Sequence, residues 1–204
     1  MVYFCFIMTS KSEKTRQFII EKTASVFNKK GYAGTSLSEI TEVTGLTKGS
    51  IYGNFKNKDE VAAEAFKYNL KNLTLRFKPA IDMEETAINK LFAFVKVYRS
   101  IYKSVFDNGG CPILNTATEA DDTFPMLKEL ANKGMMSLKN TIEKIILFGI
   151  QNNEIKKEIN AGEIAGFIIS IIEGSIVLSK LSDNNQYFIF SLDQIDSIIE
   201  SLRL

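Results

Sequence analysis

The spacing of apolar residues indicates a chain built from helices. Between residues 80 and 204, apolar positions recur every three or four residues, and no segment sustains an alternation of apolar and polar residues. Proline, glycine and asparagine clusters separate these segments. The pattern predicts an all-α protein of about nine helices, at residues 12–30, 35–44, 48–55, 57–77, 84–106, 112–120, 125–151, 161–181 and 191–202.

The segment at residues 35–58, TSLSEITEVTGLTKGSIYGNFKNK, predicts two short helices joined by a tight turn. Either Thr35 or Ser36 can cap the first helix, because a hydroxyl oxygen accepts an unpaired backbone N–H. Apolar residues then recur at three-residue steps over residues 37–43. Gly45 suits the positive φ at which helices end. Helix, glycine turn and helix form the helix-turn-helix pattern.

The second of these helices leaves polar side chains exposed when Ile51 and Phe55 point inward. Lysine can donate to guanine, and small polar or aromatic hydroxyl groups can donate to phosphates. A packed helical hairpin with a solvated polar face is the alternative. The residues predicted to contact DNA are Thr35, Ser36, Thr47, Lys48, Gly49, Ser50, Tyr52, Asn54, Lys56 and Lys58.

A longer stretch carries a resemblance to a known family. Residues 19–32 (IIEKTASVFNKKGY), 35–40 (TSLSEI) and 45–61 (GLTKGSIYGNFKNKDEV) resemble the N-terminal domain of TetR-family transcriptional regulators. The resemblance implies a helical homodimer that represses transcription and releases DNA when it binds a small molecule. It also implies that Lys48, Gly49 and Ser50 approach base edges, while phosphates are contacted by Thr35, Tyr52, Asn54 and Lys58. Asn54 is a departure, since many members carry histidine there.

Composition excludes several other classes of function. The 204 residues are 45% hydrophobic and 24% charged, which is ordinary for a soluble globular protein. The absence of histidine excludes histidine-based catalysis and histidine metal sites. Cys5 and Cys111 form no CxxC motif, so no disulfide framework is predicted and a reduced, cytoplasmic location fits best. We expect no enzyme activity, no metal and no cofactor.

Charge is distributed unevenly along the chain. Residues 1–78 carry 13 Lys and Arg against 7 Asp and Glu, a net +6, whereas residues 79–204 carry 12 against 17, a net −5. A basic segment attracts a polyanion and an acidic one repels it. Chance fluctuation is the alternative, but the asymmetry favours DNA contact through the N-terminal third only.

The segment at residues 161–181 is apolar on almost every side, which is typical of a helix buried on several faces. Glu173 at its centre argues against a membrane span. Small residues at four-residue intervals allow another helix to approach closely. We therefore expect a dimer interface formed with the last helix, and packing within one subunit is the alternative. The predicted interface residues are Gly166, Ser170, Gly174, Leu178, Ile195 and Ile199.

The C-terminal part also carries many aromatic and methionine residues, which suit an apolar ligand site as well as a core. The predicted ligand-binding residues are Phe66, Leu70, Phe94, Tyr98, Tyr102, Cys111, Asn115, Glu119, Met126 and Glu173. Glu173 either bonds across a dimer or points into the pocket, where it would select a cationic or hydroxylated ligand. The expected inducer is mainly hydrophobic with one polar end.

Together these features predict a helix-turn-helix DNA-binding domain at residues 9–57 and a helical ligand-binding and dimerisation domain at residues 58–204. The protein is interpreted as a transcriptional regulator, in particular a ligand-released repressor that binds a palindromic operator. A helical protein that binds small molecules or partners without reading DNA is the alternative. The apolar run MVYFCFIM at residues 1–8 is too short to span a bilayer, and Met8 is a second possible start.

Overall fold

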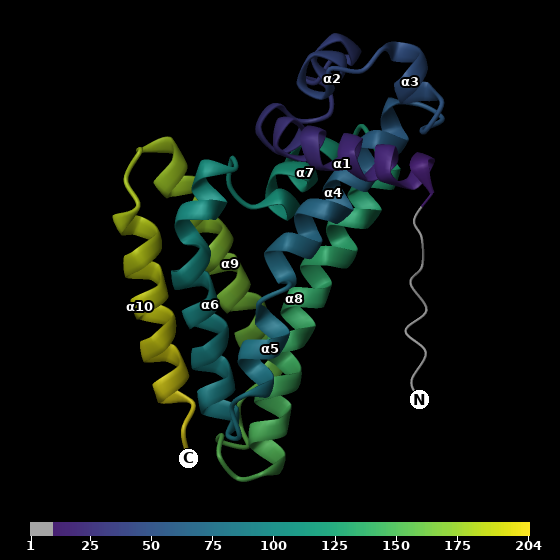
Figure 1. Ribbon diagram of the computed structural model, residues 1–204. Helices are drawn as coiled ribbons and strands as arrows, with labels where there is room; N and C mark the ends of the chain where they lie inside the picture. Colours follow the sequence, from purple (N-terminus) through teal and green to yellow (C-terminus); the bar gives the residue numbers. More distant parts are fainter. Residues whose placement is uncertain (1–9) are drawn as a thin grey trace, which may run out of the picture. The chain divides into compact units, whose positions relative to one another are not determined.

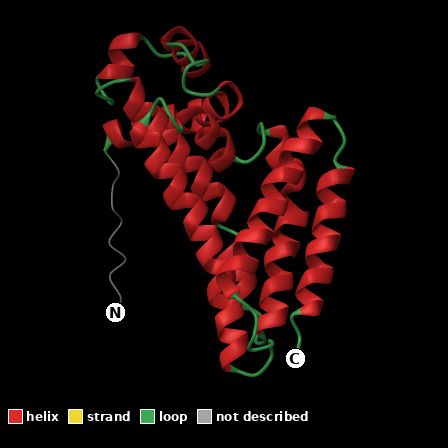
Figure 2. Ribbon diagram, turned by 180° about the vertical axis from the view of Figure 1, so that it is seen from behind, coloured by secondary structure: helices red, strands yellow, loops and turns green. Residues whose placement is uncertain are grey.

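The computed structural model describes residues 10–204, and this part of the chain is helical with short connections (Figure 2). The expected all-α fold is confirmed, and residues 1–8 with their two possible starts lie outside the described residues. Within residues 10–204, ten helices follow one another, one more than the approximate number expected for the chain. They are α1 (Lys11–Lys30), α2 (Leu37–Thr44), α3 (Lys48–Tyr52), α4 (Lys58–Thr74), α5 (Phe77–Asp82), α6 (Ala87–Asp107), α7 (Pro112–Ala120), α8 (Pro125–Gln151), α9 (Ala161–Leu181) and α10 (Gln186–Ser201).

The described part of the chain divides into two compact units: unit 1 ends at Asn69, and unit 2 spans residues 70–204. The division falls within α4, later than the domain boundary expected at residue 58. The first turns of α4 explain this position, because Val61, Ala62 and Ala65 are buried in the core of unit 1. That core also contains Ile19, Ile20, Ala24, Phe27, Ile40, Ile51 and Phe55.

Local capping signals account for many of the helix boundaries. The Ser10 side chain accepts from the backbone of Glu13, and Glu13 reaches back to the Ser10 N–H in a capping box. Asn57 accepts from the N–H of Glu60 at 2.9 Å near the start of α4, and Asn160 caps α9. These contacts satisfy backbone donors that lack a partner inside the helix.

Two boundaries differ from the sequence prediction. Pro79 was expected to end the fourth helix, but α4 ends at Thr74 and Pro79 lies in the first turn of α5. Proline is tolerated there because first-turn N–H groups have no helical acceptor. The last helix begins at Gln186 rather than near residue 191, and it has no side-chain cap that could have marked its start.

In unit 2, α9 packs against α8 and α10, and α6 packs against α8 and α10 (Figure 1). Among the described residues, α9 is the one helix long and apolar enough to cross a membrane, but 44% of that stretch is buried inside the protein. Burial of this extent also fits the core helix of a globular domain.

The residues predicted for a dimer interface separate into two groups. Gly166, Ser170, Gly174 and Leu178 lie on the accessible side of α9, and Leu178 is 55% exposed. Ile195 and Ile199 of α10 are instead 0% and 1% exposed. These two isoleucines pack within the subunit, so their inclusion in the interface is corrected.

Candidate nucleic-acid interface

The helix-turn-helix is formed by α2, a short turn and α3, and its ends are set by local contacts. Ser36, not Thr35, caps α2 in a capping box with Glu39. Gly45 adopts the left-handed conformation at φ 67°, which glycine accepts without steric cost. Thr47 then caps α3 by accepting from the N–H of Ser50 at 3.2 Å. The turn and the second cap therefore match the sequence prediction.

Helix α3 has one buried side and one accessible side. Ile51 is 0% exposed and Phe55, just after the helix, is 2% exposed, so both anchor the helix in the core of unit 1. Lys48 and Gly49 are exposed, and the Tyr52 side chain is 45% exposed. This accessible side carries donors that suit base edges and phosphates.

Thr35 and Lys58 are placed differently from the predicted phosphate contacts. Thr35 is 0% exposed, and its hydroxyl donates to the carbonyl of Gly31 at 2.6 Å. The Lys58 ammonium donates to the carbonyl of Thr35 at 2.7 Å and lies 4.1 Å from the centre of the Tyr32 ring. Both side chains thus stabilise the connection between α1 and α2.

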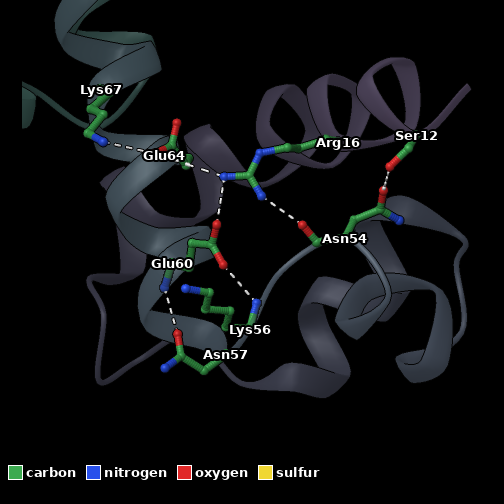
Figure 3. Close-up of polar contacts among 8 residues, drawn as sticks. All are labelled: Ser12, Arg16, Asn54, Lys56, Asn57, Glu60, Glu64 and Lys67. Atoms are coloured by element: carbon green, nitrogen blue, oxygen red, sulfur yellow. Dashed lines mark hydrogen bonds and ion pairs between the residues drawn. The ribbon is translucent and has the colours of Figure 1, made fainter. Parts of the chain in front are cut away.

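Asn54 also bonds to the protein itself. Its side-chain amide donates to the carbonyl of Ser50 at 2.8 Å, and its Oδ1 accepts from the Ser12 hydroxyl at 3.0 Å. Asn54 therefore joins the end of α3 to the start of α1 (Figure 3). The phosphate contact expected of Asn54 stays a prediction, and these bonds give its side chain a structural role as well.

Arg16 makes contacts next to the recognition helix that the sequence pattern did not reveal. Its guanidinium donates to the backbone carbonyl of Asn54 at 2.7 Å and to the Glu60 carboxylate at 2.8 Å (Figure 3). It also lies 4.1 Å from the centre of the Phe55 ring. These partners are 38 to 44 residues away in sequence, so no local spacing could have identified them.

Glu60 completes this cluster from α4. One carboxylate oxygen accepts from Arg16 and the other accepts from the backbone N–H of Lys56 at 2.7 Å. The Lys56 N–H, followed by Arg16, lowers the pKa of Glu60 below its ordinary value. We call Arg16, Asn54, Phe55 and Glu60 the Arg16 clamp, because it joins α1, the end of α3 and α4.

The predicted ligand-binding residues fall into three sets. Phe66, Phe94, Tyr98, Cys111 and Glu173 are buried, while Leu70, Tyr102, Asn115 and Glu119 are half-buried and Met126 is 42% exposed. A short contact joins two of them across the sequence: the Cys111 thiol donates to Oε1 of Glu173 at 3.1 Å. A groove of about 450 Å³ on unit 2 is lined elsewhere, by α6 and α10 residues that include Phe92, Lys96 and Asp196.

An accessible, capped recognition helix on a buried three-helix scaffold defines a helix-turn-helix DNA-binding regulator. Two family profiles match the chain: "Bacterial regulatory proteins, tetR family" over residues 19–65, and "Tetracyclin repressor-like, C-terminal domain" over residues 87–193. The second alone covers more than half of the chain. The protein belongs to the TetR family of transcriptional regulators.

Individual relatives support the same assignment. A solved TetR-family regulator from Cytophaga hutchinsonii is 40% identical, with a TM-score of 0.89 over 96% of this chain and 98% of that one. The uncharacterised regulator YxaF of Bacillus subtilis is 25% identical over 94% of this chain and 98% of its own length. The transcriptional repressor DhaR of Mycobacterium sp. is 22% identical over 90% of this chain and 89% of its own length.

The Arg16 clamp predicts that Arg16→Ala, which removes a positive charge, and Glu60→Gln, which removes a negative charge, both weaken DNA binding. Arg16→Ala and Glu60→Gln should each cost about 1 kcal/mol of binding to DNA selected by the wild-type protein, because both release the end of α3. Simple electrostatics would instead make Glu60→Gln bind more tightly. Fluorescence anisotropy across salt concentrations measures both effects, with Glu21→Gln on the exposed side of α1 as the matched control. A salt slope reduced by about 1 in Arg16→Ala would show direct phosphate contact instead.

Glu173 predicts a pH dependence of stability. Burial raises its pKa from 4.5 to about 7, since the interior disfavours the carboxylate. The folded state therefore holds a proton that the unfolded state releases, so stability falls as the pH rises from about 4.5 to about 7. The neighbouring Cys111 and Tyr98 have pKa values raised well above their ordinary ones and stay neutral over this range.

Glu173→Gln should remove this loss and become more stable than the wild type by about 2–3 kcal/mol at pH 8, with little difference at pH 5. Urea unfolding at the two pH values measures the difference. Glu163→Gln, an exposed carboxylate on the same helix, is the control and should show no such change. Parallel pH profiles of the wild type and Glu173→Gln would contradict the assignment.

Proposed function

We propose that the protein is a homodimeric transcriptional repressor that binds a palindromic operator and releases it when a small molecule binds unit 2. The observation that carries this proposal is the accessible side of α3, held by caps and by the Arg16 clamp. The repressor name of the relative DhaR supports the direction of regulation. A cytoplasmic location accords with DNA binding, and the function needs neither catalysis nor a cofactor.

The proposed DNA contacts follow the exposure of each side chain. Lys48, Gly49 and the half-buried Ser50 begin α3 and are assigned to base edges. Ser36, Thr47, Tyr52 and Lys56 are exposed and are assigned to phosphates, which fix the position of the protein but carry no sequence information. Two recognition helices would enter successive major grooves when they lie about 34–36 Å apart, or a multiple of that distance.

The proposed dimer interface is an apolar stripe on α9 and α10. Phe167, Leu178 and Leu181 are 54%, 55% and 81% exposed along α9, and Phe190 of α10 is 62% exposed. Gly166, Ser170 and Gly174 lie on the same accessible side of α9. A monomer rarely exposes so many large apolar side chains on neighbouring helices, and a second copy would cover them with the same surface.

Substitutions on α3 test the DNA contacts. Lys48→Ala should weaken binding to DNA selected by the wild-type protein by about 1–3 kcal/mol and relax sequence specificity if Lys48 contacts a guanine. Tyr52→Phe should weaken binding to selected and random DNA alike, because phosphates are common to both. A gel shift at several salt concentrations measures these effects, and circular dichroism checks folding. Unchanged affinity in both folded variants would favour the alternative, a helical ligand-binding protein that does not read DNA.

A glycine on α9 tests the dimer. Apart from its chain neighbours and the backbone of its own helix, no atom of the subunit lies within 4 Å of a Cβ built on Gly174, so Gly174→Phe should fold normally while blocking close approach of a second copy. We expect light scattering to give a dimeric mass for the wild type and a monomeric mass for this variant. Asn140→Phe, on the exposed side of α8, is the matched control and should remain dimeric. A monomeric wild type, or a dimeric Gly174→Phe, would contradict the interface.

A further inference from the structure

The interior of unit 2 contains two polar atoms that have no hydrogen-bond partner in the described part of the chain. They are Oη of Tyr98, a residue 1% exposed, and Oε2 of Glu173, a residue 7% exposed. Cys111 lies beside them, and its thiol donates to the other oxygen of Glu173 at 3.1 Å. The three residues come from α6, from the residue before α7 and from α9, so the fold brings together groups far apart in sequence.

The bond from Cys111 leaves Glu173 incomplete in either protonation state. Its Oε2 is an unpaired acceptor when the carboxyl group is ionised and an unpaired donor when that oxygen carries the proton. Buried polar groups usually have partners, and a buried carboxylate usually has a cation. Among residues 10–204, no Lys or Arg forms an ion pair with Glu173. Glu173 is therefore not one half of an internal salt bridge.

Aromatic rings pack around the ring of Tyr98, one of these two residues. The Tyr98 ring lies 5.0 Å from Phe77, 5.4 Å from Phe94 and 6.4 Å from Phe188, measured between ring centres. The faces of aromatic rings attract cations, and a desolvated carboxylate attracts them more strongly. A neutral hydroxyl group would gain only hydrogen bonds here, and an acidic group would be repelled.

We propose that Glu173 and Tyr98 form the polar end of the effector site, and that the effector is a protonated amine with an apolar body. This inference rests on the proposed ligand-released function and names the class of its ligand. The ammonium group would donate to Oε2 of Glu173 and to Oη of Tyr98, while Cys111 keeps its bond to Oε1. The half-buried Tyr102 and Phe106 follow Tyr98 at helical spacing on α6 and would contact the apolar body.

Three compound series on the full-length protein test this proposal. Phenylalkylamines of graded chain length are compared with the phenylalkyl alcohols and phenylalkanoic acids of the same lengths, by thermal shift and calorimetry. We expect at least one amine to raise the melting temperature and bind about tenfold or more tightly than its alcohol, whereas the acids should not bind. Tyr98→Phe should weaken amine binding while keeping the preference for the amine.

Glu173→Gln should abolish the preference for amine over alcohol, and Glu163→Gln on the same helix should keep it. Binding of no amine, preference for the alcohol or the acid, or an unchanged preference in Glu173→Gln would each overturn the proposal. Release of bound DNA is measured separately by anisotropy. An amine that binds through Glu173 without releasing DNA would overturn ligand release and leave the site standing. A neutral or acidic compound that releases DNA would overturn the amine site and leave ligand release standing.

Discussion

The guanidinium of Arg16 is the contact that holds the end of α3 to both α1 and α4. Helix α3 has only five residues, and a helix of this length has little stability of its own. Its direction is therefore set by its buried anchor Ile51 and by contacts at its two ends, the Thr47 cap at the start and the Arg16 clamp at the finish. Arginine suits the second position because its planar group can donate to a carbonyl and a carboxylate at once while stacking on an aromatic ring. The accessible side of α3 is useful to DNA only because the opposite side is held in this way.

Features with local causes could be predicted from the sequence. The Gly45 turn, the Thr47 cap and the α9 cap at Asn160 depend on residues close in the chain. The wrong prediction that Pro79 ends a helix has a local cause as well, because proline can follow the end of one helix or stand in the first turn of the next. The clamp could not be predicted, since spacing along α1 identifies its polar side but not which distant carbonyl or carboxylate a polar residue will meet.

The predicted site residues also divide into those placed by a local pattern and those whose partners depend on the whole fold. Exposure of Lys48 and Tyr52 follows from the amphipathic pattern of α3, which places Ile51 and Phe55 inward. Thr35, Asn54 and Lys58 have donors that suit phosphates equally well, but their hydrogen bonds go to groups within unit 1. Apolar spacing likewise placed Ile195 and Ile199 on one face of α10 without showing that the same subunit covers that face. Periodicity identifies residues that share a surface, whereas the partner of the surface depends on the whole fold.

Helix α9 connects the two proposals made for unit 2. Glu173 points into the interior, while the next residue, Gly174, lies on the exposed stripe proposed as the dimer interface. An isolated carboxylate in the core costs stability, and a core built for stability alone would place an apolar side chain there. A cation bound to Glu173 would remove that free-energy cost. Its binding would therefore stabilise α9, the helix that also presents the stripe. Since a packed helix moves as a unit, any shift of α9 on binding at Glu173 would also move the surface on which a second subunit is proposed to rest.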